Sequence, residues 1–164
     1  MIELQWHEVV GDSYHTLLRI TPTDQKYWSK DKLFNKFTKL NKVGDLYFTL
    51  GAGPEMGDLV SNINRTSDAE PHIGKYIQIS IPKNYRDENE FIRKLIENDS
   101  KYKDHLDYDL FPAKVGNEVW YMADDGYNSN SYVAGLLISV GVSPPTPPVS
   151  TPGFQKPVPA KHFK

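Results

Sequence analysis

The sequence from residue 127 to residue 137 reads Tyr127-Asn128-Ser129-Asn130-Ser131-Tyr132-Val133-Ala134-Gly135-Leu136-Leu137. Its second half repeats apolar residues at the spacing of a helix with one buried face. Residues 128–131 are small and polar, and such residues cap a helix N-terminus by accepting hydrogen bonds from free backbone N–H groups. A hydroxyl at such a position can also serve as a nucleophile, because the free N–H groups and the helix dipole favour negative charge.

Length and composition indicate one domain with an ordinary core, since 38% of the 164 residues are hydrophobic. The formal net charge of −2 gives no general attraction to nucleic acid or to an anionic membrane. The chain has no cysteine, which excludes disulfides, thiolate metal sites and a cysteine nucleophile in this sequence. No run reaches membrane-spanning length and no signal peptide is recognisable, so we expect export to depend on other machinery or on a larger parent chain.

Alternating apolar residues predict a series of short strands. His7 continues the polar side of the first strand, where we expect it to be solvated, and His15 lies well inside the second. The strands are expected over residues 2–7, 13–20, 46–50, 76–81 and 118–122.

Two helices are predicted besides the one that begins near residue 128. Residues 87–102 carry a stripe of apolar side chains, with acidic residues at the positive end of the helix. Another helix is expected around 30–40, in a segment with six basic residues from Lys26 to Lys42, which favours a solvated face over a site for an anionic partner. The pattern predicts an α+β fold in which an antiparallel sheet packs against the helix after residue 128 and the 87–102 helix.

The glycine-rich stretch 51–57 differs from the phosphate-binding loops, since it is neither GxGxxG nor GxxxxG followed by lysine. We interpret it as a strand-to-turn connection in which Gly51 and Gly53 line a substrate cleft. The aspartates of the loop 101–112 lack the glycine and the closing glutamate of an EF-hand, and His72 has no partner at metal-ligand spacing. We therefore expect no metal and no cofactor.

The composition changes near residue 144, and seven of the 12 prolines follow it. Such a segment favours extended polyproline or turns. Because it also contains Val149, Phe154, Val158 and Phe163, a tail that packs on the domain is favoured over one that extends away from it. The expected division is a catalytic-type domain over 1–143 and a proline-rich tail over 144–164.

A strand histidine at His15, followed much later by Asn128-Ser129-Asn130-Ser131-Tyr132-Val133, resembles the circularly permuted papain-like hydrolases. This superfamily includes bacterial cell-wall peptidases and lecithin:retinol-type acyltransferases, and its nucleophile helix typically opens Asn-Cys-x-x-Phe-Val. Ser129 stands where the family has its cysteine. The same motif, with the downstream Pro152-Gly153-Phe154, is also similar to toxin modules at the C-termini of large secreted bacterial proteins.

The resemblance implies a toxin or effector that hydrolyses or transfers an acyl group through acyl-Ser129, with His15 as the base. It implies an amide or ester substrate, either peptidoglycan peptide or lipid acyl chains, and delivery or secretion from a bacterial cell as part of a larger system. A cognate immunity protein is a possible partner, and no nucleic-acid partner is expected.

The remaining members of the implied site are less defined by the motif. The family places a polar residue on the strand beside the histidine strand, and Thr49 is the nearest candidate, ahead of Tyr47. The backbone N–H of Ser129, helped by Asn128 or Tyr127, would meet the oxyanion. Ser131 is a second candidate for the substrate site, although a helix cap explains it more simply.

Three interpretations of Ser129 are open: a working nucleophile, a relic used for binding, or a serine that replaces a cysteine. The first is favoured, although a serine needs a base during attack whereas a thiol ionises with modest help. The alternative function is a non-catalytic binding module on the same scaffold, with a cleft formed by 51–57 and 127–131. A nuclease or nucleotide-directed toxin that uses residues 26–42 is a third hypothesis.

Overall fold

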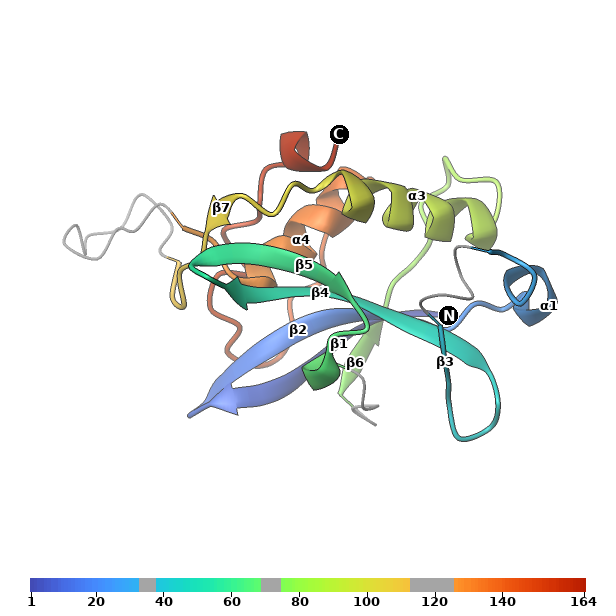
Figure 1. The fold of residues 1–164 in the computed structure, drawn as a ribbon, viewed down its shortest axis with the longest axis horizontal. Coiled ribbons are helices and arrows are strands. Elements are labelled where there is room, and N and C mark those ends of the chain that lie inside the picture. The colour runs from blue at the N-terminus through green and yellow to red at the C-terminus, as the bar shows by residue number, and fades with distance from the viewer. Residues whose placement is uncertain (33–37, 69–74, 113–125) are drawn as a thin grey trace.

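The computed structural model describes residues 1–32, 38–68, 75–112 and 126–164. Over these residues the chain forms an α+β fold with an antiparallel sheet and helices packed on it, as predicted (Figure 1). The sheet order is β6-β1-β2-β4-β5-β7, and β3 pairs with β4. The strands are β1 (Ile2–Val10), β2 (Ser13–Ile20), β3 (Lys39–Leu40), β4 (Leu46–Glu55), β5 (Asp58–Ile63), β6 (Tyr76–Gln78) and β7 (Leu106–Asp107).

Helices α3 and α4 begin within one residue of the predicted starts. Asp87 accepts a hydrogen bond from the backbone N–H of Glu90, and Asn128 accepts from the first turn of α4. The helices are α1 (Gln25–Trp28), α3 (Glu88–Lys101) and α4 (Ser129–Ser139), and 3-10 turns are found at η1 (Thr66–Asp68) and η2 (Ala160–Phe163).

The prediction of a helix around 30–40 is wrong for the described residues at the start and at the end of this range. Helix α1 ends before it at Trp28, and Lys39 and Leu40 form β3, because they pair with Tyr47 and Leu46 across a turn. Residues 33–37, the strand predicted over 118–122 and His72 all lie outside the described residues.

Strands β1 and β4 are longer than the alternation predicted, and β6 is shorter. Strand β4 continues through Gly51 and Gly53 because β5 pairs with it as far as Glu55 opposite Asp58. The glycine stretch is therefore mostly strand, and the turn comes at Met56 and Gly57.

The two faces of the sheet differ in character. Leu4, Leu18 and Leu50 belong to the apolar core on one face, together with side chains of α3 and α4. The opposite face carries Glu3, Gln5, His15 and Arg19, all of which are buried. The expectation of a solvated polar side on β1 is therefore wrong, because these groups are covered and contact one another, with Arg19 Nε 3.9 Å from Glu3 Oε2.

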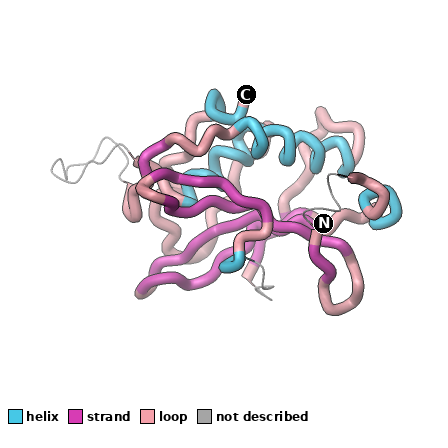
Figure 2. Tube along the Cα trace, in the orientation of Figure 1, coloured by secondary structure: helices cyan, strands magenta, loops and turns pink. Residues whose placement is uncertain are grey.

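Strands β2 and β4 pair only between Leu18–Ile20 and Phe48–Leu50. The β1–β2 hairpin and the β4–β5 hairpin both continue beyond this region, so the two hairpins diverge (Figures 1 and 2). The N-terminus of α4 reaches this divergence, where Asn130 bonds to the backbone of β2. Residues of both hairpins can therefore approach the N-terminus of α4 where the two hairpins diverge.

The segment 144–164 packs along α4. The backbone N–H of Val158 donates to the carbonyl of Ser131 at 2.9 Å, and Phe163 is fully buried in the common core. Gly135 permits this approach, since a Cβ there would lie 2.3 Å from the Val158 carbonyl oxygen. Among the described helices, none has the length and apolar character needed to cross a membrane.

Candidate active site

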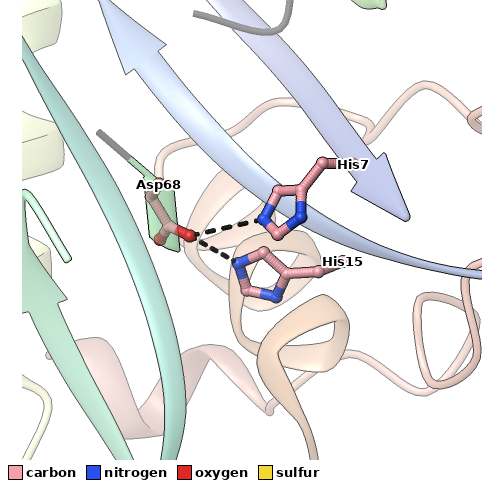
Figure 3. A group of neighbouring side chains, drawn as sticks. All are labelled: His7, His15 and Asp68. Carbon is pink, nitrogen blue, oxygen red and sulfur yellow. Dashed lines mark hydrogen bonds and ion pairs between the residues drawn. The ribbon is translucent and has the colours of Figure 1, made fainter. Parts of the chain in front are cut away.

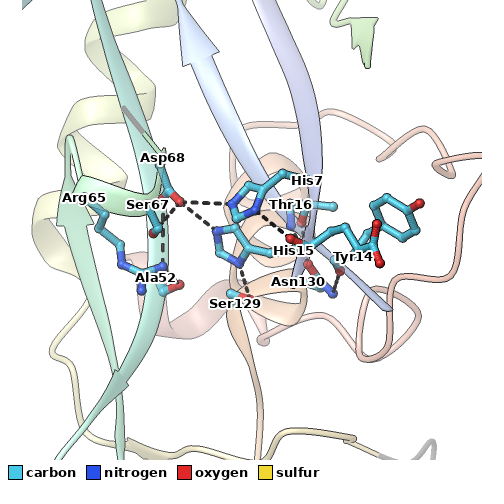
Figure 4. A network of polar contacts seen from close by, with 11 residues as sticks. His7, Tyr14, His15, Thr16, Ala52, Arg65, Ser67, Asp68, Ser129 and Asn130 are labelled. Atoms are coloured by element: carbon cyan, nitrogen blue, oxygen red, sulfur yellow. Dashed lines mark hydrogen bonds and ion pairs between the residues drawn. The ribbon is translucent and has the colours of Figure 1, made fainter. Parts of the chain in front are cut away.

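The fold brings the side chains of His15 and Ser129 into contact. Nδ1 of His15, on β2, lies 2.7 Å from Oγ of Ser129, the first residue of α4. Both residues are 7% exposed, so the contact is shielded but reachable from one side. The two positions are 114 residues apart in the chain, and the divergence between β2 and β4 allows them to meet (Figure 4).

The other ring nitrogen of His15 contacts Asp68, the last residue of η1. Nε2 lies 3.1 Å from Oδ1 of this carboxylate, whose side chain is fully buried. The hydroxyl of Ser67 donates to the same oxygen at 2.9 Å, and Nη1 of Arg65 is 3.9 Å from Oδ2. Ser129, His15 and Asp68 therefore form a continuous chain of polar contacts.

The electrostatics of the cluster favour a neutral His15 beside an ionised Asp68. Burial alone would raise the pKa of Asp68, but hydrogen bonds from His15 and His7 and the charge of Arg65 hold that pKa well below its usual range. Burial lowers the pKa of His15 despite the raising effect of Asp68. With the carboxylate ionised, Nε2 of His15 carries the ring proton, and Nδ1 is left to accept the hydrogen bond from Ser129.

Asn130 fixes the position of α4 relative to His15. Its Oδ1 accepts from the N–H of Thr16 at 2.7 Å and from the Thr16 hydroxyl at 2.9 Å. Its Nδ2 donates to the carbonyls of Tyr14 and Pro152, both at 2.9 Å. Because Tyr14 and Thr16 flank His15 in sequence, this one side chain sets the register between His15 and Ser129.

Asn128 serves as a cap rather than as an oxyanion donor. Its Oδ1 accepts from the N–H groups of Asn130 and Ser131, while its Nδ2 donates to the carbonyls of Leu110 and Pro152. With both ends of the amide occupied, Asn128 has no proton to offer a substrate. The backbone N–H of Ser129 remains a candidate, since the first residue of a helix has no intrahelical acceptor.

Ser131 and Tyr127 do not reach the substrate side of the site. Ser131 is fully buried, and its hydroxyl donates to the carbonyl of Gly153 at 2.9 Å, which ties α4 to the C-terminal segment. Tyr127 pairs through its backbone with Asp107 and Asp109, and Nζ of Lys156 lies 5.0 Å from its ring centre. The structure thus gives both residues contacts within the fold, and their expected contact with substrate stays a prediction.

Thr49 is not brought to His15. The register of β2 with β4 places it opposite Arg19, four residues along β2 from His15, and its Oγ1 has no hydrogen-bond partner among the described residues. The polar group that reaches the ring comes instead from Asp68, in the segment that follows β5. The strand neighbour expected as the third member is therefore replaced by a carboxylate from a turn.

Gly51 and Gly53 make room for that segment. A Cβ on Gly51 would lie 2.5 Å from Oδ2 of Asp68, and one on Gly53 would lie 2.2 Å from Nη2 of Arg65. Glycine inside a strand often marks a close approach of another group. Sequence reasoning missed Asp68 and Arg65, and the two glycines are a signal that could have indicated a close approach to this strand.

A cavity of about 220 Å³ opens beside Ser129 and His15. Its mouth is apolar, since Val9, Leu110 and Phe111 are each at least half exposed there. Its floor is polar. The polar lining residues include His7, His15, Arg65, Ser67, Asn128, Ser129 and Asn130, and Gly53 of the predicted cleft also lines the cavity. The cavity could accept a group with an apolar portion and a carbonyl directed at Ser129.

His7 also differs from its expected place in solvent. It is paired with His15 across β1 and β2, lines the cavity and lies with Nε2 3.6 Å from Oδ1 of Asp68 (Figure 3). The site therefore contains two histidines that share one carboxylate.

No protein-family model matches this chain, and the comparisons with curated proteins and with solved structures found no match.

Proposed function

We propose that this protein hydrolyses or transfers acyl groups through an acyl-Ser129 intermediate, with His15 as the base and Asp68 as the group that orients the ring. One observation carries the proposal: Nδ1 of His15 is 2.7 Å from Ser129 Oγ while its Nε2 is 3.1 Å from Asp68 Oδ1. A nucleophile in contact with a base that is itself held by a third group is the arrangement that activates a hydroxyl.

The reaction follows from this geometry. As Ser129 Oγ attacks the carbonyl carbon, its proton moves to Nδ1 of His15, and the resulting imidazolium is stabilised by Asp68. The developing oxyanion lies at the N-terminus of α4, where the N–H of Ser129 and the helix dipole favour negative charge. His15 then returns the proton to the leaving amine or alcohol. A water or another acceptor attacks acyl-Ser129 with His15 again as the base, and His15 passes that proton to Ser129 Oγ as the acyl–oxygen bond breaks.

The order of elements supports a permuted papain-like scaffold as part of the proposal. Strand β2, which carries His15, precedes α4, which carries Ser129, and the antiparallel sheet packs against this helix. The third member departs from the expected pattern because Asp68 comes from η1 and not from a neighbouring strand.

The substrate class that we propose is an amide or ester with an apolar portion, such as a lipid acyl chain or a peptide from peptidoglycan. The apolar mouth formed by Val9, Leu110 and Phe111 supports this choice. A role as a toxin or effector in bacterial competition, with an immunity partner, rests on the sequence resemblance alone.

The alternative of a non-catalytic binding module is less well supported. A binding module would have no need for a serine hydroxyl aligned with a neutral imidazole, or for an ionised carboxylate buried behind that ring. The desolvation cost of a buried charge can exceed what its pairing returns, so an ionised Asp68 behind the ring is more readily explained by a function that uses it.

A serine-directed fluorophosphonate probe tests the proposal directly. We expect one adduct per chain, located on Ser129 by peptide mass spectrometry, and none in a Ser129→Ala variant. His15→Ala should slow labelling by about 10²-fold or more, because it removes the base. Ser100→Ala is a matched control, since its exposed hydroxyl bonds only to the carbonyl of Glu97 among the contacts described. Labelling at another residue, or labelling of Ser129 unchanged by His15→Ala, would overturn the mechanism.

A further inference from the structure

The side of His15 that faces away from Ser129 holds a second arrangement of donor atoms. His7 on β1 is paired with His15 on β2, and their ring centres are 4.9 Å apart. Both Nε2 atoms are directed at Oδ1 of Asp68, at 3.6 and 3.1 Å respectively (Figure 3). Two imidazole nitrogens and one carboxylate oxygen therefore converge from three separate segments of the chain.

We propose that His7, His15 and Asp68 bind a divalent transition-metal ion such as Zn²⁺, which reaches them through the cavity. Two histidines and a carboxylate are a common ligand set for zinc and related first-row ions. Ligand atoms about 2.0–2.1 Å from a tetrahedral ion lie about 3.3 Å from one another. The three donor atoms here lie within 4.8 Å of one another, so a small closure completes the geometry.

The atoms behind these ligands already hold them in position. Nδ1 of His7 is 3.3 Å from the carbonyl oxygen of Glu8, which can accept its proton when Nε2 of the same ring binds an ion. Ser67 donates to Oδ1 of Asp68. A metal-bound histidine usually donates its second N–H to a carbonyl or carboxylate in this manner.

The charges around the site act on a cation in opposite directions. The carboxylate of Asp68, whose side chain is fully buried between the two rings and Arg65, attracts it. The positive charge of Arg65, with Nη1 3.9 Å from Oδ2 of Asp68, opposes the ion and should weaken its binding. The fourth ligand would be water from the cavity, which both histidines line.

Metal binding has a consequence that rests on the proposed function. Once Nε2 of His15 binds the metal, the proton of the neutral ring must reside on Nδ1, where it is donated to Ser129 Oγ. Nδ1 then has no lone pair with which to accept the serine proton. Bound metal and the acylation of Ser129 therefore exclude each other, and the metal acts as an inhibitor of the proposed reaction.

The binding site is tested with Zn²⁺ alone, by calorimetric titration of the full chain in a non-coordinating buffer and by nitrogen NMR of the imidazole rings. We expect one ion per chain, with the Nε2 resonances of His7 and His15 shifted. His7→Gln and Asp68→Asn should each weaken binding by about tenfold or more. The control is the double variant His105→Ala/His162→Ala, because these two rings lie 5.4 Å apart and could capture zinc at the surface.

Several outcomes would overturn the site: no zinc binding, binding without shifts at His7 and His15, or binding lost only in the double variant. The NMR shifts of the unaltered protein decide the matter even if one variant fails to fold. Probe labelling of Ser129 without metal tests the proposed hydrolase separately. Zinc should slow this labelling in the unaltered protein and slow it ten times less in His7→Gln. This result would establish that metal binding and acylation of Ser129 exclude each other.

Discussion

The carboxylate of Asp68 occupies the space where a side chain on Gly51 would lie. A Cβ at that position would be 2.5 Å from Oδ2 of Asp68, well inside van der Waals contact. Strand β4 therefore also shapes the site. Because Gly51 has no side chain, η1 lies close enough to β4 for Asp68 to reach His15.

Gly51→Ala should displace Asp68 from His15. The carboxylate is short, buried and held by Ser67 and His15, so it cannot rotate aside without losing a contact. We expect the free energy of unfolding to fall by about 1–3 kcal/mol, as for other overpacked sites, and probe labelling of Ser129 to slow markedly. Gly53→Ala, which displaces the longer and more mobile side chain of Arg65, should slow labelling much less. Equal labelling rates in Gly51→Ala and the unaltered protein would contradict this account.

Asp68→Asn removes the negative charge of this side chain and keeps its size, so it tests whether the site needs the charge. The amide can keep the size of the carboxylate, but it can donate to Nε2 of His15 and so stabilise the tautomer with the proton on Nδ1, which cannot accept from Ser129. The corresponding change in a serine-protease triad lowers the rate by about 10⁴-fold, and we expect a loss of about 10³-fold or more in the labelling rate. A variant that folds normally and labels within a few-fold of the unaltered rate would show that Asp68 does not orient the ring.

Ser129→Cys tests whether the site can activate a nucleophile of the type found in the family that it resembles. The chain contains no cysteine, so any alkylation by iodoacetamide reports on the introduced thiol alone. An ordinary thiol, with a pKa of about 8.5, is almost entirely protonated at acidic pH, whereas a thiol beside a histidine at a helix N-terminus ionises more readily. At about pH 6 we expect alkylation at least about tenfold faster than in Ser100→Cys, an exposed control. A slower reaction than in that control would argue against activation by His15.

Asn130→Ala should damage both stability and site geometry. It leaves the N–H of Thr16 and the carbonyls of Tyr14 and Pro152 without their present partner, and unsatisfied buried groups of this kind cost about 1–3 kcal/mol each. We expect a loss of about 3 kcal/mol in urea unfolding, together with slower labelling of Ser129. Asn98→Ala is the matched control, since Asn98 bonds to Ser139 at the far end of α4 and should affect stability without affecting labelling. The prediction fails if the two variants are indistinguishable in both measurements.

Local sequence signals were sufficient for the elements with strong patterns and clear caps. Strand β2 ends before Pro22, α3 follows an apolar stripe with acidic residues at its start, and α4 begins among the small polar residues 128–131. The contact of His15 with Ser129 is also present, although its catalytic role stays a prediction. These features depend on neighbouring residues or on the order of elements, which a sequence contains directly.

Asp68 and His7 could not be assigned in the same way, because their role depends on pairing between distant segments. Asp68 is 53 residues from His15, and the turn that carries it lies over the sheet only because β5 pairs with β4 and two glycines leave room. His7 seemed a surface residue from the alternation of β1, a pattern that does not reveal whether the second face of the sheet is covered. The positions of Asp68 and His7 in the site therefore depend on the pairing of distant strands, which a local sequence pattern does not determine.

Asp99 gives a prediction about stability that is independent of the site. Its carboxyl is buried in α3, where the hydroxyl of Tyr132 donates to Oδ1. Burial raises the pKa of Asp99 to about 6, the hydrogen bond from Tyr132 lowers it, and the charge of Asp104 raises it further. The pKa in the folded state thus lies above the ordinary value of about 3.9 that an aspartate has in an unfolded chain, so the folded protein binds the Asp99 proton more tightly.

The sign of this shift fixes the pH dependence. The contribution of Asp99 is fully present below about pH 4 and is lost as the pH rises through about 6, because ionisation then leaves a buried charge. Across that interval the free energy of unfolding should fall by up to about 3 kcal/mol relative to Asp99→Asn, which cannot ionise. Taking the difference between the two proteins in urea unfolding at each pH cancels the opposite trends of other carboxylates. Tyr132→Phe should move the loss to higher pH, since it removes the hydrogen bond that favours the ionised form. Parallel stability curves for the unaltered protein and Asp99→Asn would show that the carboxyl titrates in the folded state as it does in the unfolded chain.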